Sequence, residues 1–542
     1  MDPRQEITTG HENASAGAEN EQGDDSVYKR GQASKWTRGR KGDRQNGGDR
    51  KRAKPGKEPR VPRERERDYT TREYVPRLDE QGNPIPKSER RPKKKVACMI
   101  GYCGTGYNGM QIQNNPDVKT IEGDLFDAFV KAGAISPENA DDLKKNGFMR
   151  AARTDKGVHA AGNVISCKLI IEDSDILQRI NSHLPDQVRV WGIERTNKSF
   201  DCRKMCSSRV YEYLLPTYSL LPPKPKTVLA ELVRKAREDH PGVLRDDTEG
   251  SEWWKNTAQA IRDAGITQQD LEAAQAALES ASSSSGEAKV RTHNENGEIT
   301  DMGRLIKSIK AVENQQRRAY NVSTERLNLF REAMKLYEGS HNFHNFTIGK
   351  PFKDASARRY MKQTTVSDPF IIEGTEWVSI KIHGQSFMLH QIRKMIAMAV
   401  LVVRTGCPIT RIRDCFGPTK INIPKAPALG LLLENPVYEG YNGMLEKFGY
   451  NRIDFEKYKQ EMDEFKMKYI YDKIYAEEVK ENTFYGFFGF IDTFKAGGDS
   501  KEGKHIFDFL GAVFESGLDE NGNVVGGYEE EPIEVRAQDN VD

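Results

Sequence analysis

Apolar residues in this chain gather in two stretches where strand-like runs alternate with helix-like spacing. The first stretch opens at Val96 with the run VACMIGY, which predicts a buried strand. A helix is predicted between Thr120, a residue type that caps helix starts, and Gly133, a type that ends helices. Further elements are predicted as strands over 163–169, 189–195 and 209–215 and a short helix over 176–183.

The second stretch repeats this order of elements. A helix is predicted over residues 325–338 and a strand over 376–383. A second helix is predicted over 386–404, with Gly406 closing it. Residues 442–494 have a mostly helical pattern, which predicts a layer covering a sheet. Strands alternating with helices indicate an α+β protein in which the helices pack on a sheet.

Changes in composition divide the chain into six predicted segments. They are a disordered basic arm over 1–93, a first folded half over 94–221, an insertion, partly helical and partly flexible, over 222–325, a second folded half over 326–440, a helical layer over 441–495 and a flexible acidic tail over 496–542. We therefore expect two related halves with additions between and after them.

Composition supports a folded core with disordered tails. The chain has 542 residues, more than the ~100–200 of a typical domain, and it is 36% hydrophobic and 30% charged. Its net charge of +2 hides basic runs starting at Lys51, Arg60 and Arg90 and an acidic end around Glu529. Such an arm suits a polyanionic partner or an import receptor, so we expect a nuclear protein. A solvated tail without a specific partner is the open alternative.

Other features argue against several classes of protein. Seven scattered cysteines do not form a disulfide framework, and the pairs Cys98/Cys103 and Cys202/Cys206 lack a histidine cluster that would complete a metal site. The longest apolar run, Met395–Val403, is far short of the ~20 residues that span a bilayer, and no apolar signal segment opens the chain. Phosphate-cradling and nucleophile-elbow motifs are also missing. We expect an intracellular, soluble protein whose chemistry needs neither metal nor cofactor.

The segment RTDKGVHA, residues 153–160, is the strongest candidate for chemistry. It places Asp155 in a Lys-Gly turn just before a predicted strand. An acid beside glycine is by itself ordinary turn chemistry. A second feature changes its interpretation: Arg393 lies in an apolar helical pattern, where an unpaired buried charge is costly. We expect the pair Asp155–Arg393, with Arg393 extending to solvent at the helix edge as the alternative.

Aromatic and basic residues accompany Asp155. Tyr211 and Tyr213 share a predicted strand face with Arg209, and Arg153 is two residues from Asp155. Tyrosine offers a flat surface on which a base can stack, and arginine neutralises phosphate. Enzymes that act on a base in structured RNA extrude it into a pocket. Core packing is the alternative for both tyrosines.

Six segments resemble, in order, the motifs of TruA-type pseudouridine synthases. They are YCGTGYNGMQ, RTDKGVHAAGNVISCKL, SSRVYEYLLP, GSHNFHNFT, GQSFMLHQIRKM and INIPKAPALGLLLENPVY. They span roughly residues 95–440, and six motifs in order are more specific than any one of them. The long arm, the insertion and the C-terminal helices resemble the eukaryotic members of that family.

The resemblance implies an RNA isomerase. It implies that a uridine in tRNA, with snRNA and mRNA as further candidates, loses its N1 glycosidic bond, turns, and rejoins through C5. It implies no cofactor. It also implies two related halves joined in a mixed, largely antiparallel sheet around a basic cleft.

The resemblance assigns roles to five residues. Asp155 matches the catalytic aspartate, Tyr211 the tyrosine packed on the uracil, and Arg393 the arginine paired with the aspartate. Substrate-binding roles fall to Arg153, which enters the RNA stack as the uridine flips, and to Leu431 in the base pocket. Arg209 is predicted to bind substrate because it shares the strand face of Tyr211, and not from the resemblance.

Two departures from the bacterial members matter. Val210 stands where they often carry a second arginine, so we expect a different contact with RNA near Tyr211. The insertion has no counterpart there, and we expect it and the C-terminal helices to occupy the surface of the bacterial dimer, which predicts a monomer. Two other functions stay open at this point: a non-catalytic RNA-binding protein on the same scaffold, and a nucleoside hydrolase that uses a lone carboxylate.

Overall fold

The first strand, β1 (Lys94–Tyr102), is the apolar run that the sequence predicts from Val96. The computed structural model describes residues 91–494 except 114, 116, 137–138, 141–142 and 284–297, together with 504–505. The predicted arm over 1–93 and tail over 496–542 therefore lie almost entirely outside the described residues. All elements named below belong to the unit Pro86–Asp542.

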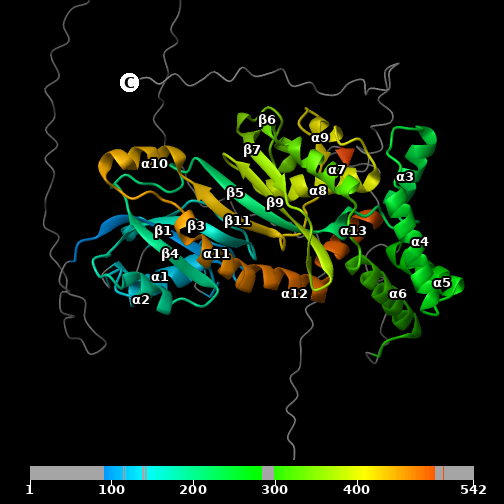
Figure 1. Ribbon diagram of the computed structural model, residues 1–542, viewed down its shortest axis with the longest axis horizontal. Coiled ribbons are helices and arrows are strands. Elements are labelled where there is room, and N and C mark those ends of the chain that lie inside the picture. Colours follow the sequence, from blue (N-terminus) through cyan, green and yellow to red (C-terminus); the bar gives the residue numbers. More distant parts are fainter. Residues whose placement is uncertain are drawn as a thin grey trace, which may run out of the picture. The chain divides into compact units, whose positions relative to one another are not determined.

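A mixed sheet of ten strands organises the described part of the chain (Figure 1). Its order is β4 (Val188–Arg195), β1, β3 (His159–Leu169), β11 (Leu431–Val437), β5 (Ser208–Pro216), β9 (Thr375–Gly384), β7 (Arg358–Val366) and β6 (Gly339–Asn342). Two short strands lie off this path, β2 (Met149–Arg150) on β3 and β8 (Phe370–Ile372) on β9. Within it only β11 and β3 run parallel, so the predicted α+β fold with a largely antiparallel sheet is confirmed.

The two halves of the sequence exchange strands at the centre of the sheet. β11, from the second half, lies between β3 and β5, and β5, from the first half, pairs with β9. Leu433 of β11 is in register with Tyr211 on one side and with Ala160 on the other. Because of this exchange, only β11 separates β3, the strand that follows Asp155, from β5, the strand that carries Tyr211.

Helices cover both faces of the first half. Alternate residues of β1 enter two different cores: Val96 and Cys98 pack with α1 (Ile121–Lys131) and α2 (Ile176–Ser182), whereas Met99 belongs to the other core. Thr120 caps α1 by accepting from the Gly123 amide, as predicted. On the opposite face, α11 (Lys459–Phe465) sets Phe465 edge-on to Trp191 of β4, at 5.3 Å between ring centroids.

In the second half, α7 (Thr324–Lys335) and α8 (Gln391–Thr405) pack on the face that carries Ile380 and Ile382. The prediction that α8 begins at Ser386 is wrong. His390 has a left-handed backbone with φ of 62°, which interrupts a helix, and the Gln391 side chain accepts from the Met388 amide at 2.9 Å. The predicted end at Gly406, also left-handed at φ 73°, is confirmed.

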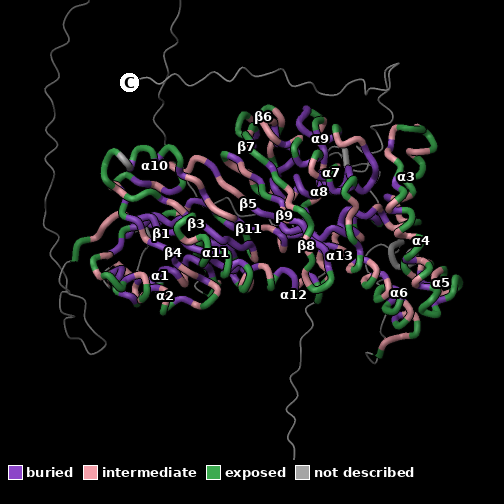
Figure 2. The backbone as a smooth tube through the Cα atoms, viewed as in Figure 1, coloured by how far each residue is buried: buried purple, intermediate pink, exposed green. Residues whose placement is uncertain are grey.

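The described part of the insertion consists mainly of four helices. Its helices are α3 (Val228–Asp239), α4 (Thr248–Asp263), α5 (Gln268–Ser283) and α6 (Asp301–Arg318). α4, α5 and α6 share a small core around Ile261 and Ile309, and Figure 2 shows largely exposed or intermediate residues on these helices. A buried ion pair between Arg326 of α7 and Asp247 connects the insertion to the sheet domain.

The C-terminal segment is mostly helical. It contains α10 (Glu439–Leu445), α11, a π-helical turn (Lys466–Tyr471), α12 (Asp472–Glu481) and α13 (Thr483–Thr493). Lys466 and Tyr471 contact Glu212 of β5. Because neighbouring strand residues point to opposite faces, the layer at this point covers the face opposite Tyr211.

Candidate active site

Asp155 is exposed on the loop between β2 and β3. The Val158 amide donates to the Asp155 carbonyl at 3.1 Å, and Gly157 has the positive φ of 75° that such a turn favours. The strand predicted from Asn163 starts earlier, at His159, so the acid lies four residues before a buried strand. The loop therefore holds one carboxylate just before the start of a central strand of the sheet.

The glycine-rich loop after β1 packs against the backbone of the Asp155 loop. The Met110 amide donates to the Thr154 carbonyl at 3.1 Å. A Cβ atom on Gly109 would lie 2.9 Å from the Thr154 oxygen, and one on Gly104 would lie 2.3 Å from the Val158 oxygen. Both positions require glycine because two backbones meet there without room for a side chain. The glycines noted in the sequence thus fix the position of Asp155.

Buried polar groups hold the same loop from inside. The Tyr102 hydroxyl bonds to Thr154 Oγ1 at 2.8 Å, and the Asn163 amide donates to the Ala152 carbonyl at 3.1 Å. His159 Nδ1 accepts from the Gly104 amide at 3.1 Å, which requires an unprotonated Nδ1. Burial lowers the pKa of His159 to about 4, aided by the charge of Lys473, so the ring is neutral at physiological pH.

Arg393 projects from the first turn of α8 and is half-buried. Its Nε donates to the Ala426 carbonyl at 2.5 Å, and the Ala426 amide donates to the Arg393 carbonyl at 3.1 Å. Burial lowers the pKa of Arg393, while Tyr213 and Asp155 act in the opposite direction. The guanidinium is therefore fixed on one side by the 423–428 segment and is electrostatically coupled to Asp155.

Tyr211 lies where the two hydrophobic cores meet. Its ring is edge-on to Phe387, with centroids 5.1 Å apart. Burial raises the pKa of Tyr211 to about 12; Arg209 opposes this, and Asp155 adds to it. The hydroxyl is protonated near neutral pH.

Three elements that are remote in sequence thus converge on one place: the β2–β3 loop, β5 and α8. Asp155 acts electrostatically on both Tyr211 and Arg393. Direct contact between the Asp155 carboxylate and the Arg393 guanidinium stays a prediction.

The three predicted substrate-binding residues differ in their surroundings. Arg153 is exposed, two residues from Asp155. Leu431 is half-buried at the start of β11, in register with Tyr213. Arg209 donates to the Ala151 carbonyl at 2.8 Å and to the Gln385 carbonyl at 3.3 Å. It therefore ties the start of the Asp155 loop to the segment that leads into α8, a positioning contact that the sequence did not suggest.

Sequence reasoning also missed the charged residues behind the site. The Glu122 side chain is fully buried, pairs with Arg150 and accepts from the Ile112 amide at 2.9 Å. Burial raises the pKa of Glu122, against the lowering effect of that amide and of Arg150 and Arg153. The available signal was an acid between Ile121 and Leu125 in the α1 pattern, which helical spacing alone does not distinguish from a surface residue.

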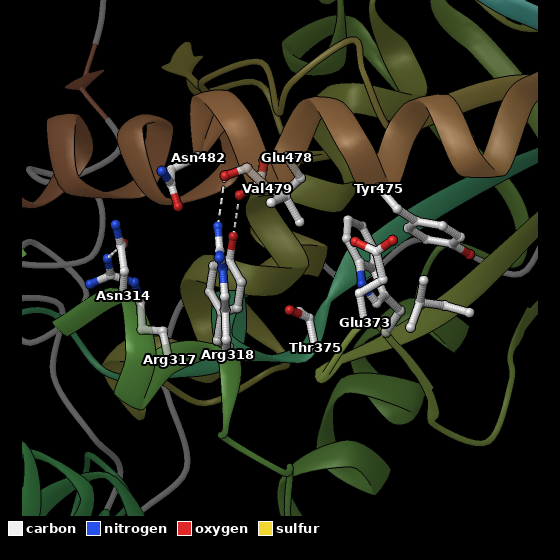
Figure 3. Close-up of a pocket in the computed structure, with 12 residues that line it drawn as sticks. Asn314, Arg317, Arg318, Glu373, Thr375, Tyr475, Glu478, Val479 and Asn482 are labelled. Atoms are coloured by element: carbon white, nitrogen blue, oxygen red, sulfur yellow. Dashed lines mark hydrogen bonds between the residues drawn. The ribbon is translucent and has the colours of Figure 1, made fainter. Parts of the chain in front are cut away.

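A small cavity lies elsewhere, between α6, β9 and α12 (Figure 3). Arg318 donates to the Val479 carbonyl at 2.7 Å, and the Tyr218 hydroxyl bonds to Glu478. Its volume of about 10 Å³ is room for roughly one water molecule, too small for a nucleotide.

Metal and membrane features are absent from the described residues. These residues hold no group of three His, Cys, Asp or Glu side chains arranged for a metal ion. Nor does any helix among them have the length and apolar character to cross a membrane.

Comparison with known proteins points to one family. A family model described as tRNA pseudouridine synthase matches residues 333–439, which include Arg393 and Leu431. The chain is 62% identical to tRNA pseudouridine synthase 1 of Candida albicans over 446 residues, 81% of this chain and 73% of that protein. It is 52% identical to the Saccharomyces cerevisiae protein of the same name over 514 residues, 92% and 90% of the two chains. A second Saccharomyces cerevisiae protein, tRNA pseudouridine(27/28) synthase, is 38% identical over 71% of this chain and 96% of its own length.

Proposed function

Because this chain belongs to the TruA family of tRNA pseudouridine synthases, isomerases that act on tRNA, we propose that Asp155 is the carboxylate that carries out the reaction. The observation that carries the proposal is the convergence of Asp155, Tyr211 and Arg393 from three separate elements. An exposed acid on a rigid loop, coupled to a fixed arginine, is available to a ribose that enters from solvent.

The isomerisation breaks the N1–C1′ bond and forms a C5–C1′ bond, while the C5 hydrogen leaves as a proton and N1 takes one up. We assign to Asp155 the attack or deprotonation at the ribose. Arg393 supports that role, since a neighbouring guanidinium favours the ionised form of a carboxylate and limits its orientations. The hydrogen bond from Arg393 to the Ala426 carbonyl holds the guanidinium in place before RNA arrives.

Tyr211 is suited to pack on the uracil. With a pKa of about 12, only roughly 10⁻⁵ of the hydroxyl is ionised at pH 7. Its oxygen can therefore take the C5 proton only while its own proton leaves, and the coupled Asp155 is suited to receive it. Leu431, beside Tyr213 in the adjacent strand, supplies an apolar wall for the same base.

Base extrusion requires a group to replace the flipped uridine. Arg153 is exposed and lies on the same loop as Asp155, so its planar guanidinium can fill the vacated stack when Asp155 reaches the ribose. Arg209 keeps the two catalytic segments together through its two carbonyl contacts.

The test uses tRNA labelled with tritium at uridine C5. The protein is expected to release tritium to solvent and to form pseudouridine, and Asp155→Ala is expected to do neither while still binding tRNA. Asp186→Asn, a change of a strongly exposed acid on another loop, is the matched control and should keep full activity. Release that continues after Asp155→Ala would overturn the assignment.

The same assay separates the rival functions. A hydrolase would leave free uracil and an abasic RNA, and an RNA-binding scaffold would show no dependence on Asp155. Complete conversion of labelled uridine to pseudouridine, with free uracil below detection, is expected.

Location, oligomeric state and further substrates extend the proposal. We propose a nuclear monomer that also modifies snRNA and mRNA; the basic runs of the arm support nuclear import. A fluorescent fusion should lose nuclear enrichment when residues 1–93 are deleted, and the full chain should sediment as one copy. Pseudouridine mapping with and without Asp155→Ala identifies the RNAs.

A further inference from the structure

The insertion contains an open groove that the Asp155 site does not use. It lies between α3 and α4 (Figure 1) and has a volume of about 640 Å³, within the range of ligand-binding sites. The segment Pro222–Pro225 forms one wall. Polar and aromatic residues also line it: Arg234, Arg237, Glu238, Asp247, Trp254, Lys255 and Arg404.

The charges in this groove do not cancel. Glu238 pairs with Arg234 at 2.6 Å. Asp247 pairs with Arg326 and also caps α4 by accepting from the Gly250 amide. These pairs neutralise both acids of the groove.

Two cations remain. Arg237 donates to the Arg245 carbonyl at 3.1 Å, and Lys255 is exposed. Neither has a carboxylate partner in the part of the chain that the structure describes. The groove therefore presents uncompensated positive charge.

Buried donors point to the same ligand chemistry. Arg404 is 6% exposed and pairs with Asp492 at 2.9 Å, yet its Nη1 has no hydrogen-bond partner within the described residues. Arg237 Nε is likewise buried and unpaired there. Unsatisfied buried donors are costly, and an anion is the group that satisfies guanidinium nitrogens best.

Trp254 adds a flat surface beside these cations. It is half-exposed, its indole nitrogen donates to the Pro222 carbonyl at 3.4 Å, and its ring is edge-on to Trp253 at 4.7 Å. A fixed, partly exposed aromatic ring next to lysine and arginine is the arrangement on which single-stranded nucleotides stack.

The groove is also connected directly to the catalytic helix. Arg404, in its wall, is on α8 together with Arg393. Arg404 follows Arg393 by eleven positions, about 16 Å along the helix axis. An RNA that places one uridine at Asp155 extends well beyond that distance.

We propose that this groove binds a second nucleotide of the tRNA substrate, with its phosphate at Arg237 and Lys255 and its base on Trp254. The proposal rests on the action of this family on tRNA, and it gives the insertion a role in substrate recognition. It commits to RNA rather than to an acidic peptide because the stacking surface and the cations lie side by side.

The test compares two lysines of the insertion in the full chain. Lys255→Gln removes a groove charge, and Lys235→Gln removes an exposed charge on α3 that does not line the groove. Binding of full-length tRNA is measured from 50 to 300 mM salt. Lys255→Gln should weaken binding by about three- to tenfold and lower the log-log salt slope by about 0.7–0.9, the value for one lost phosphate contact. Lys235→Gln should match the unmodified protein.

Trp254 supplies a second measurement. Trp254→Ala should weaken tRNA binding, whereas Trp254→Phe, which keeps an aromatic ring, should retain most of it. The rate of tritium release at saturating tRNA should be unchanged in every groove variant, so failure here is distinct from failure of the Asp155 assignment. Equal affinities and salt slopes for Lys255→Gln and Lys235→Gln would overturn the proposal. A dye bound in the groove that polyglutamate displaces and tRNA does not would also overturn it.

Discussion

Asp155 and Glu212 are two carboxylates near the centre of one sheet, and they have opposite surroundings. Asp155 is exposed on a loop. Glu212 is 3% exposed within β5, and it accepts from Ser379 at 2.5 Å and from Tyr471 at 2.7 Å. Lys466 lies 3.2 Å from Glu212.

The difference shows that one sheet carries an acid available for chemistry, Asp155, and another that stabilises the fold, Glu212. Burial alone would raise the pKa of Glu212, but Lys466 and the two hydroxyl donors lower it, so the acid is ionised and committed to its partners. Lys466 also binds Glu434 of β11 at 2.8 Å and so connects the two central strands to the C-terminal layer. Asp155 is held by its loop backbone instead, which leaves its carboxylate on the solvent side.

The largest expected effect concerns Asp155, the exposed carboxylate. Asp155→Asn should lower the rate of pseudouridine formation by about 10⁴-fold or more, because the amide cannot act as a nucleophile or a base. The free energy of unfolding should change by less than about 1 kcal/mol, as is usual for an exposed residue. Tritium release and urea denaturation measure the two quantities. Large destabilisation with modest loss of activity would reverse the roles assigned here.

The next largest effect concerns Glu212, the buried carboxylate. Lys466→Met should destabilise the protein by removing the cationic partner of Glu212. It leaves Glu212 buried without the lysine that pairs with it and leaves Glu434 with Lys381, 3.6 Å away. The free energy of unfolding should fall by about 3–5 kcal/mol. Lys468→Met, at an exposed position of the same π-helical turn, is the control. Activity per folded molecule should change little at low temperature.

A second variant separates the charge effect from lost packing. Adding Glu212→Gln to Lys466→Met removes one uncompensated charge and should recover part of the lost stability. No recovery would mean that the lysine stem, rather than its charge, stabilises the layer.

His159 should make the free energy of unfolding depend on pH in a range where Glu212 does not. The unfolded chain binds a proton near pH 6.5, whereas the buried ring binds one only near 4, so the stabilising contribution of this residue is complete above pH 6.5 and lost as pH falls to 4. Across that window the loss should approach about 3 kcal/mol. Glu212, with its lowered pKa, should contribute only to losses below about pH 4.3.

Urea denaturation at pH 8, 6.5, 5.5 and 4.5 measures this dependence. His159→Gln should reduce the slope between pH 6.5 and 4.5, and His390, whose pKa burial lowers to about 4, should account for part of the slope that is left. An unchanged slope in that variant would assign the proton uptake to another group.

The smallest effects distinguish the two tyrosines of β5. Tyr213 donates to the Pro427 carbonyl at 2.8 Å, so Tyr213→Phe should cost about 1 kcal/mol of stability with little loss of turnover. Tyr211→Phe should lower turnover by about 10²-fold, the size of one proton-transfer contribution, at nearly constant stability. Measuring both variants by tritium release and thermal unfolding tests the assignment, and an exchange of the two outcomes would contradict it.

Local elements were predicted well because their signals are local. Thr120 caps α1 and Gly406 ends α8, as residue type and spacing indicated. The start of α8 was misplaced because Ser386 to Leu389 continue an acceptable helical pattern, and only the backbone of His390 interrupts it. The candidate catalytic residues came from motif order, and the structure brings Asp155, Tyr211 and Arg393 into one electrostatic neighbourhood.

The sequence by itself determined the Asp155 turn, the glycines beside it, the two alternating halves and the family. Each of these depends on residue type and short spacing. Tertiary structure decided that β11 enters between β3 and β5, that Arg209 ties the Asp155 loop to α8, and that Lys466 neutralises Glu212 from behind. The Lys466–Glu212 pair joins residues 254 positions apart. Strand alternation tells which side a residue faces, but the partner on that side depends on the packing of the whole chain.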